Sequence, residues 1–563
     1  MKRIISILFT AILAIPSCTD HFEDLNSDPN NLVDVPAINL FTSVIINTCG
    51  REGTGAYYCE RGWAQHWSYC CYKSDDRYLP RTFDLNVELV YSQELLDLEL
   101  IIRKTRADIS REKEMEKNTS LLAAAKIMRV FNFHRLTDLV GDIPYLEALQ
   151  GLDDDGVTTP KYDTQESIYM DLLDELEEAN ELLDLSVVSN FGKGDLLFGG
   201  DPARWKKFGN SLRLRILNRC AGTPWFFAYD MVGTIPLTTT PGAAAYPGAD
   251  AEIDAILDNP ARYPIISGNE DNVLLVYPGD EYKQPIYQAF YSRTPFNMAE
   301  TLINWLVDRN DPRIHIFACP TWDYVNGITT DAYVGEQNGS PYLSSYDPEV
   351  SAIGYRICKD ESAPLYIMTH DEIEFIKAEH YLRTGSEMAA REAYEAGITA
   401  SMERWGCSDG SIVFPLGFYR GEIYTYTITQ HVDFASYLAE PMVNWVVAGS
   451  EGEKYQRILE QKWAASFTQG FQVWTEVRRT GFPARIFEYE YSATYFPDLG
   501  MPVRMNIMEV SQINSANLEE AKKRQNIEQT NYGLFSTDGI KSQMWWHTRK
   551  NPVPTETDPP EIW

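Results

Sequence analysis

Apolar residues recur at helical spacing in two blocks of the chain, with a turn-rich stretch between them. In the first block, one helix face is marked by the i, i+3, i+4, i+7 pattern of Leu121, Ala124, Ala125 and Met128. A second stripe follows Asp163 and Thr164, which are suited to cap a helix, and is formed by Ile168, Leu172, Leu176, Ala179 and Leu183. These stripes predict helices packed on a shared core.

A third helix is expected to begin at Asp201-Pro202, which read as an N-cap followed by the first helical position. Its apolar face is Trp205, Phe208, Leu212 and Ile216. Its other face is basic, with Arg204, Lys206, Lys207, Arg213 and Arg215. In an acidic chain, such a face favours an internal strip of ion pairs over an anion-binding site.

Helical spacing fades between about residues 241 and 364, where Pro, Gly, Asn and Tyr are frequent, and returns at residue 365. Thr369 and Glu372 then have the spacing of a capping box, and Gly385 is expected to end that helix. The next helix runs from near Ser386 to Trp405-Gly406, and its small residues allow close packing: Ala389, Ala390, Ala393 and Ala396. The pair has the length of a tetratricopeptide repeat, although any two-helix hairpin has a similar length.

The first seventeen residues form a secretory signal: Lys2 and Arg3, a short apolar core, then Pro16-Ser17-Cys18. The apolar run is shorter than the roughly 20 residues that cross a bilayer, and no later stretch is apolar enough. The end of the signal resembles a bacterial lipobox, so we expect lipidation at Cys18. The alternatives are a buried first helix and an unmodified thiol beside an ordinary cleavage site. The polar, acidic residues 18–38 suit a tether.

Composition limits the classes of partner. The formal charge is -32, and -34 once the two basic residues of the signal are removed, which disfavours nucleic-acid binding. Lipidation of Cys18 would leave eight cysteines in the body: Cys49, Cys59, Cys70, Cys71, Cys220, Cys319, Cys358 and Cys407. Export brings the chain into an oxidising environment, in which disulfides between these cysteines are possible. Buried free thiols are the alternative. No Cys-x-x-Cys pair is present.

Several phrases, in order behind the lipobox, resemble the SusD/RagB family of nutrient-binding outer-membrane lipoproteins, in particular its SusD-like branch. They begin with Leu25-Asn26-Ser27-Asp28-Pro29-Asn30 and end with Trp545-Trp546. Between them come residues 137–145, 201–216, 310–313, 461–463 and 470–483, then Pro502 and Arg504. The chain departs from the family pattern at Met505-Asn506 and at His547, and eight body cysteines are many for the family.

The resemblance implies a mainly α fold, with a tetratricopeptide-like scaffold of helical pairs and a large irregular insertion of loops and short strands. Residues 39–563 would then form one SusD-like domain: helical 39–240, the insertion at about 241–364, helical 365–485 and an irregular region 486–563. It also implies a cell-surface location on the outer membrane of a Gram-negative bacterium. The implied partner is a SusC-like TonB-dependent barrel, on which the protein closes as a lid over an oligosaccharide or, in some members, a peptide.

Sugar rings present flat C–H faces to which Trp and Tyr rings are suited, and these side chains add hydrogen-bonding groups. We therefore expect ligand-binding residues where aromatic residues lie outside the predicted helices: Tyr72, Arg77, Tyr78, Tyr287, Tyr291, Trp322, Asp323 and Tyr324. Trp322 and Tyr324 have period-two spacing, which would project both rings to one side of an extended segment. Trp63 and Trp67 lie four apart, which favours one buried helix face.

The motifs of common enzyme classes are not found. Gly209-Asn210-Ser211-Leu212-Arg213 fails the nucleophile-elbow pattern at its last position, and the chain has no His-Glu-x-x-His motif and no P-loop. Asp153-Asp154-Asp155-Gly156 is acidic, but an EF-hand frame would place Gly151 and Tyr162 at its first and last ligand positions. We expect no enzymatic activity and no cofactor, with a weak structural calcium as an option. A scaffold that binds only other proteins is the remaining alternative.

Overall fold

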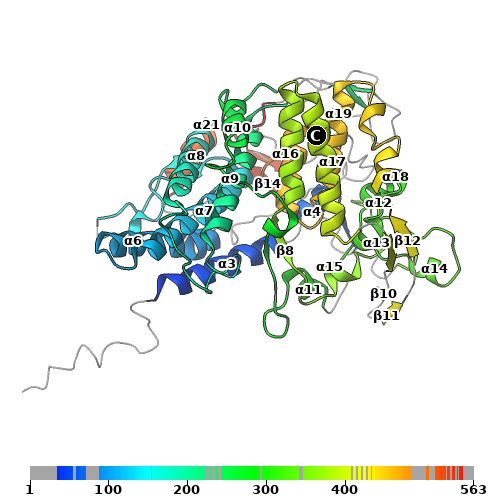
Figure 1. The fold of residues 1–563 in the computed structure, drawn as a ribbon, viewed down its shortest axis with the longest axis horizontal. Coiled ribbons are helices and arrows are strands. Elements are labelled where there is room, and N and C mark those ends of the chain that lie inside the picture. The colour runs from blue at the N-terminus through cyan, green and yellow to red at the C-terminus, as the bar shows by residue number, and fades with distance from the viewer. Residues whose placement is uncertain are drawn as a thin grey trace, which may run out of the picture.

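The fold was examined in a computed structural model. It describes residues 35–54, 59–70, 88–153, 155–223, 227–229, 236–238, 242–291, 295–340, 347–407, 410–413, 416–419, 422–425, 429–432, 434–483, 503–505, 514–527, 529–532, 535–538, 542 and 544–548. Figure 1 shows a mainly helical molecule with short two-stranded ribbons, which confirms the predicted fold class. None of the helices that the structure describes is both long and apolar enough to span a bilayer.

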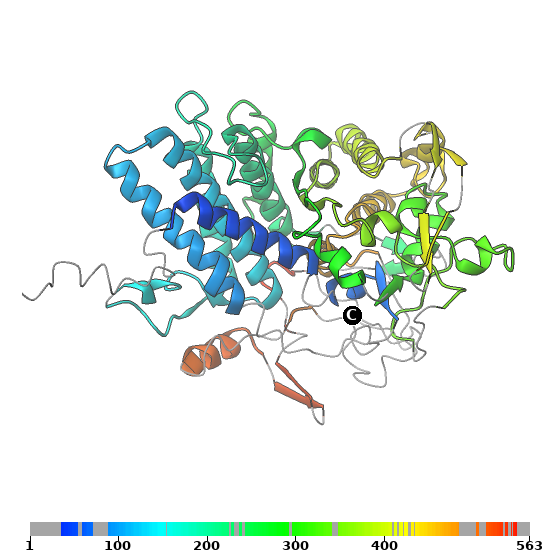
Figure 2. The same ribbon diagram turned by 90° about the horizontal axis from the view of Figure 1, so that it is seen from below.

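The first half of the chain folds into long helices that lie side by side (Figures 1 and 2): α3 (Ala37–Thr54), α6 (Leu96–Ser110), α7 (Met115–Val140), α8 (Gln165–Leu182) and α9 (Pro202–Cys220). A short π-helical turn, η1 (Val90–Leu95), precedes α6. Helix α7 is buried around its whole circumference from Ser120 to Val140 because neighbours pack on every side. The predicted stripes lie in α7 and α8, as the helical periodicity indicated.

Two predicted helix starts are confirmed. The Thr164 hydroxyl accepts a hydrogen bond from the Ser167 backbone N–H (3.2 Å) and caps α8. The Asp201 carboxylate accepts one from the Ala203 N–H (2.9 Å), and Pro202 occupies the first turn of α9. Each cap satisfies a backbone donor that has no partner within its helix.

The second helical half contains α16 (His370–Arg383), α17 (Glu387–Arg404), α19 (Glu451–Ala465) and α20 (Gly470–Thr480). Helices α16 and α17 are joined at Gly385, whose φ of 85° is left-handed, as the predicted hairpin requires. The predicted capping box is wrong in its chemistry. Thr369 is the N-cap of α16, but its hydroxyl forms no cap hydrogen bond, and Glu372 binds Arg215 instead (2.7 Å).

Short elements link the two halves. The helical ones are α10 (Ala249–Leu257), η3 (Asn269–Asp271), α11 (Pro285–Phe290), α12 (Glu300–Asp308), α13 (Ile314–Phe317), α14 (Trp322–Val325) and α15 (Tyr355–Cys358). Strand β7 (Phe296–Met298) pairs antiparallel with β1 (Trp67–Tyr69), and β6 (Val273–Leu275) pairs with β8 (Leu365–Met368). Trp63 and Trp67 are both buried, as expected, but Trp63 ends α4 (Cys59–Trp63) and Trp67 lies in β1, so they do not share a helix face.

The remaining elements are peripheral. They are β2 (Ile143–Pro144) with β3 (Tyr162–Asp163), β4 (Phe227–Tyr229) with β5 (Pro236–Thr238), β9 (Gly410–Val413) with β12 (Thr429–Val432), β10 (Leu416–Tyr419) with β11 (Glu422–Thr425), β13 (Gln529–Tyr532) with β14 (Phe535–Asp538), η2 (Gln150–Leu152), η4 (Trp445–Val447), α18 (Phe434–Ala439) and α21 (Ser515–Arg524). All seven described strand pairs are antiparallel and two-stranded. Only the hairpin β10–β11 bears on the site below.

Three of the five basic residues predicted on α9 form the internal strip of ion pairs that the sequence favoured, whereas Arg204 and Lys206 donate to backbone carbonyls. Arg213 binds Glu177 and Glu252, Arg215 binds Glu372, and Lys207 binds Asp271. Buried charges require such pairing because an unpaired ion is costly away from water.

A buried charge cluster joins the two helical halves. Glu476 of α20 binds Lys462 of α19 (2.9 Å), Arg479 (2.7 Å) and, from the first half, Arg219 of α9 (3.3 Å). Arg219 also binds Asp138 of α7. Burial alone would raise the pKa of the Glu476 carboxyl, but Arg479, Lys462 and Arg219 hold it well below its usual range. The carboxylate therefore stays charged and acts as a hub between the halves.

The six cysteines whose side chains the structure describes are buried free thiols: Cys49, Cys70, Cys220, Cys319, Cys358 and Cys407. Burial raises the pKa of Cys220, Cys319 and Cys407 to about 12. Cys59 and Cys71 lie outside the side chains that the structure describes. Of the two alternatives that the sequence left open, disulfides and buried thiols, these six cysteines follow the second.

Candidate functional site

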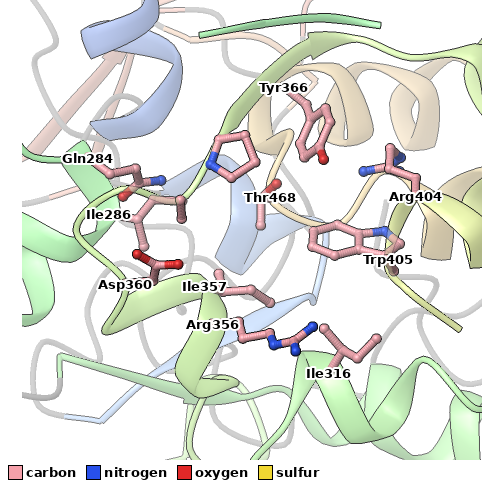
Figure 3. A pocket seen from close by; sticks show the side chains of 12 residues that line it. Gln284, Ile286, Ile316, Arg356, Ile357, Asp360, Tyr366, Arg404, Trp405 and Thr468 are labelled. Carbon is pink, nitrogen blue, oxygen red and sulfur yellow. The ribbon is translucent and has the colours of Figure 1, made fainter. Parts of the chain in front are cut away.

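A cavity of about 400 Å³ lies where the linking elements meet the end of α17 (Figure 3). Its size falls at the small end of the range for small-molecule sites. It is lined by Gln284, Ile286, Ile316, Arg356, Ile357, Asp360, Ala363, Pro364, Tyr366, Arg404, Trp405 and Thr468. Segments far apart in the sequence therefore build one concave surface, with aliphatic side chains beside a few polar groups.

Gln284 positions the α11 side of the cavity. Its side-chain oxygen caps α11 by accepting a hydrogen bond from the Tyr287 backbone N–H (2.7 Å). The backbone N–H of Gln284 donates to the backbone carbonyl of Glu361 (3.0 Å). The oxygen is thereby engaged, and Figure 3 shows the amide nitrogen directed toward the cavity. Ile286, on the next turn, adds a buried apolar side chain to the lining.

An arginine held between two aromatic rings forms the opposite wall. The guanidinium carbon of Arg404 lies 4.8 Å from the ring centroids of both Tyr366 and Trp405. Nε and Nη2 bind the two carboxylate oxygens of Asp371 on α16 (3.0 and 2.9 Å), and Nη2 also donates to the Ala465 carbonyl (2.8 Å). The third nitrogen, Nη1, is buried and has no partner among the described residues, and the same holds for Nε1 of Trp405. Two nitrogens of this wall, with three N–H groups between them, thus make no hydrogen bond within the described part of the chain.

Two exposed residues of opposite charge complete the lining. Arg356 on α15 forms no ion pair or hydrogen bond with any residue that the structure describes. Asp360, four residues later, accepts a hydrogen bond from the Ser362 N–H (2.9 Å). The two are not paired with each other, and Figure 3 shows them on different sides of the cavity. The site can therefore offer both a cation and an anion to a bound molecule.

A tyrosine pair stands beside the cavity on α11. The rings of Tyr287 and Tyr291 are 5.8 Å apart, and the side chain of Tyr291 is 69% exposed. The ammonium of Lys283 lies 5.3 and 5.8 Å from their centroids and is held by Glu361 (2.8 Å). Glu361 adjoins Asp360 of the lining. The sequence-predicted residues Tyr287 and Tyr291 therefore lie next to the cavity without lining it.

The other predicted aromatic group lies elsewhere. Trp322 belongs to helix α14, so the expected extended segment is wrong, and Trp322 and Tyr324 do not project to one side. Trp322 stacks on Tyr419 of β10 (4.9 Å, 17°) and meets Tyr424 of β11 edge-on (5.4 Å). Tyr324 is 37% exposed. Neither these residues nor Asp323, which is half-buried on the same turn, lines the cavity.

Four predicted residues, Cys18, Tyr72, Arg77 and Tyr78, lie outside the described residues. Sequence reasoning missed the lining residues Gln284, Arg356, Asp360, Tyr366, Arg404 and Trp405. For Arg404-Trp405 a weak signal existed, since both stand at the predicted end of a helix. For Arg356 and Asp360 the sequence carries no signal that separates them from the other charged residues of the chain.

Comparison with known proteins agrees with this architecture. A SusD homologue from Bacteroides fragilis is 24% identical and superposes with a TM-score of 0.67, covering 91% of this chain and 99% of its own. A chitin-binding SusD homologue from Flavobacterium johnsoniae is 21% identical, with a TM-score of 0.67 and coverage of 91% and 98%. At such identities the likeness concerns the fold. No curated protein matches the chain.

The family comparison reaches further than the structural one. The model of a SusD-like family described as "Starch-binding associating with outer membrane" matches residues 29–231 and 242–507. These ranges contain most of the helical scaffold, the buried charge cluster and all twelve residues that line the cavity. The chain therefore belongs to this SusD-like family of outer-membrane-associated binding proteins.

Proposed function

We propose that the chain is a cell-surface lipoprotein, anchored through Cys18, that captures an oligosaccharide and passes it to a partner TonB-dependent transporter as a lid. The observation that carries the capture step is the cavity beside α11. It combines aliphatic and aromatic walls with a few fixed polar groups, which suits a molecule with C–H faces and hydroxyls. The chitin-binding description of one fold relative supports a sugar as the ligand.

A binding role without catalysis agrees with the lining. Glycoside hydrolysis generally uses two carboxyl groups roughly 5 to 10 Å apart. Among the twelve lining residues, Asp360 is the one that carries a carboxyl group. The family is likewise described by what its members bind. We therefore propose capture without turnover.

Capture is tested by the binding of an oligosaccharide panel to the mature chain, measured by isothermal titration calorimetry. Tyr291→Ala removes an exposed ring beside the cavity, and we expect affinity to fall by about 10-fold or more. Tyr324→Ala is the matched control, because it makes the same change on α14, and we expect it to bind as the native chain does. The reverse pattern would assign the ligand to α14, and a panel that finds no sugar would reject the capture of glycans.

Delivery is tested by detergent extraction of the native outer membrane, purification of the full-length protein and mass spectrometry of what accompanies it. We expect a large TonB-dependent barrel with the native protein. Cys18→Ala should lose the membrane association. A native protein that stays in the membrane without a barrel would contradict the lid and favour a stand-alone binding protein.

Two other functions remain as outcomes of these tests. Peptides in place of sugars would keep the lid and change the ligand. A scaffold for protein partners would need no small-molecule site, and the 400 Å³ cavity beside exposed tyrosines is the feature that counts against it.

A further inference from the structure

The cavity offers more hydrogen-bond donors than acceptors. The donors that have no partner among the described residues are the Arg356 guanidinium, Nη1 of Arg404 and Nε1 of Trp405, and the amide nitrogen of Gln284 adds another. Asp360 is the one lining side chain that only accepts. Tyr366 and Thr468 carry hydroxyls, which serve as donors or acceptors. A ligand that satisfies this wall must therefore bring acceptor oxygens.

The Arg404 wall is built and held in place. The Arg404 side chain is 1% exposed, and two of its three guanidinium nitrogens are fixed by Asp371 and the Ala465 carbonyl. Figure 3 shows its guanidinium between Tyr366 and Trp405, facing the cavity. Because Asp371 neutralises the charge of Arg404, this residue contributes an N–H group rather than a free positive charge.

Arg356 contributes the free charge. It has no partner among the described residues, in a chain in which acidic side chains outnumber basic ones by 81 to 49. The buried arginines of this region are paired, in contrast to the exposed Arg356: Arg313 with Asp311, Arg309 with Glu460 and Arg404 with Asp371. An unpaired guanidinium on the wall of a cavity is suited to bind a carboxylate through two parallel hydrogen bonds.

We propose that the cavity binds an acidic sugar, a residue that carries a carboxylate, as part of the oligosaccharide captured under the proposed function. Arg356 binds the carboxylate. Asp360 accepts hydrogen bonds from ring hydroxyls on the other side of the cavity, and Gln284 donates to a ring oxygen. Ile357 and Trp405 contact the C–H faces of the sugar. A carboxylate adds the attraction of opposite charges to its hydrogen bonds with Arg356, which a neutral sugar lacks, so the acidic form is preferred.

The test compares each oligosaccharide of a uronic acid panel with its own methyl ester, which keeps the sugar and removes the charge. We expect the free acid to bind the mature chain about 10- to 100-fold more tightly than the ester, as for a hydrogen bond to a charged group. Arg356→Gln should abolish this preference, so that acid and ester bind with similar affinity. Arg391→Gln, on the exposed face of α17 where Arg391 pairs with Glu395, is the matched control and should keep the preference.

Each other result rejects part of the proposal. Equal binding of acid and ester, or an unchanged preference in Arg356→Gln, would overturn the acidic sugar while the capture of glycans stands. Tight binding of peptides, lost in Asp360→Asn because an ammonium group needs that carboxylate, would overturn the sugar itself. The variants are compared by circular dichroism. Arg356 is exposed and pairs with none of the residues that the structure describes, so its substitution should not affect folding.

Discussion

Arg404 serves the scaffold and the cavity at once. Its bidentate contact with Asp371 ties the end of α17 to the start of α16, and its remaining nitrogen stands at the cavity wall. A side chain that takes part in the core has little rotamer freedom left to lose when a ligand binds, which lowers the cost of ordering the site. Arg356 is exposed and has no partner within the described part of the chain, so it is the residue that a ligand would order.

His66 is a buried histidine whose charge state should be visible in the stability of the protein. Its ring is fully buried and lies 5.0 Å from that of Trp463 and 5.5 Å from that of Phe467. Burial lowers the pKa of the imidazole from 6.5 to about 3. Between these values the unfolded chain binds a proton that the folded chain does not, so the stabilisation is full above pH 6.5 and is lost as the pH falls.

Because of His66, we expect the free energy of unfolding to fall by about 1.4 kcal/mol when the pH is lowered from 7.5 to 5.5, since one pKa unit corresponds to about 1.36 kcal/mol. His66→Phe removes the titrating group and should reduce the loss over this interval by that amount. Urea denaturation of both proteins at the two pH values measures it. Identical losses would show that His66 takes up its proton in the folded state.

For the candidate site, the sequence indicated which types of side chain to expect better than it indicated which residues line the cavity. The preference for rings outside helices selected Tyr287 and Tyr291, but Tyr287 lies within α11 and Tyr291 is its C-cap, so their expected non-helical context is wrong. Arg404 and Trp405 were assigned to a helix end, because their roles depend on Asp371, Tyr366 and Phe317, none of which is near them in sequence. Partners that only the fold brings together are not visible in local spacing.

Among the elements, the α16–α17 hairpin depends on one close approach. A Cβ at Gly397 of α17 would lie 2.9 Å from the ring of Phe375 on α16, tighter than a normal contact. By contrast, a Cβ at Gly50 of α3 would meet nothing within 4 Å. The same substitution is therefore predicted to have opposite effects in two helices.

Gly397→Ala should lower the unfolding free energy by about 1–3 kcal/mol through overpacking. Gly50→Ala should raise it by about 0.5–1 kcal/mol, because alanine restricts the unfolded chain and favours helix. Chemical denaturation of the two variants beside the native protein measures both. A Gly397→Ala protein as stable as the Gly50→Ala protein would mean that the hairpin opens to admit a methyl group.

Long elements were predictable and short ones were not. The stripes of α7 and α8 and the caps at Thr164 and Asp201 span several turns, so local periodicity sufficed. Helix α14 has four residues, too few to distinguish a helical from an extended spacing, and the period of Trp322 and Tyr324 was misread. At Thr369 the capping pattern was present, but Glu372 is taken by Arg215 from another helix.

For the whole molecule, the buried charge cluster links the two helical halves, and we expect them to unfold as one cooperative unit. Glu476 joins Arg219 of the first half to Lys462 and Arg479 of the second, and Arg479 binds Glu379 of α16 (2.6 and 2.8 Å). Removing the charge of one member leaves its partners buried and unpaired, which typically costs about 3–5 kcal/mol. That cost should be shared by helices of both halves.

We therefore expect Glu476→Gln to increase amide hydrogen exchange in peptides from both α7 and α16, followed by mass spectrometry. Glu519→Gln on α21, a residue with an exposed side chain paired to Lys522, is the control and should leave both unchanged. Faster exchange confined to the second half would show that the halves unfold independently.

The cluster is also where much of the family resemblance resides. Lys462, Glu476 and Arg479 belong to the phrases of residues 461–463 and 470–483, and the Trp546 indole donates to Asp138, which binds Arg219. The residues that line the cavity fall outside these phrases. Overall sequence similarity will therefore group relatives by their shared fold and not by the ligand that they bind. Sorting relatives by ligand would instead require comparing positions 284–286, 356–366 and 404–405 alone. Under the acidic-sugar proposal, a basic residue at 356 would mark the relatives that bind acidic polysaccharides.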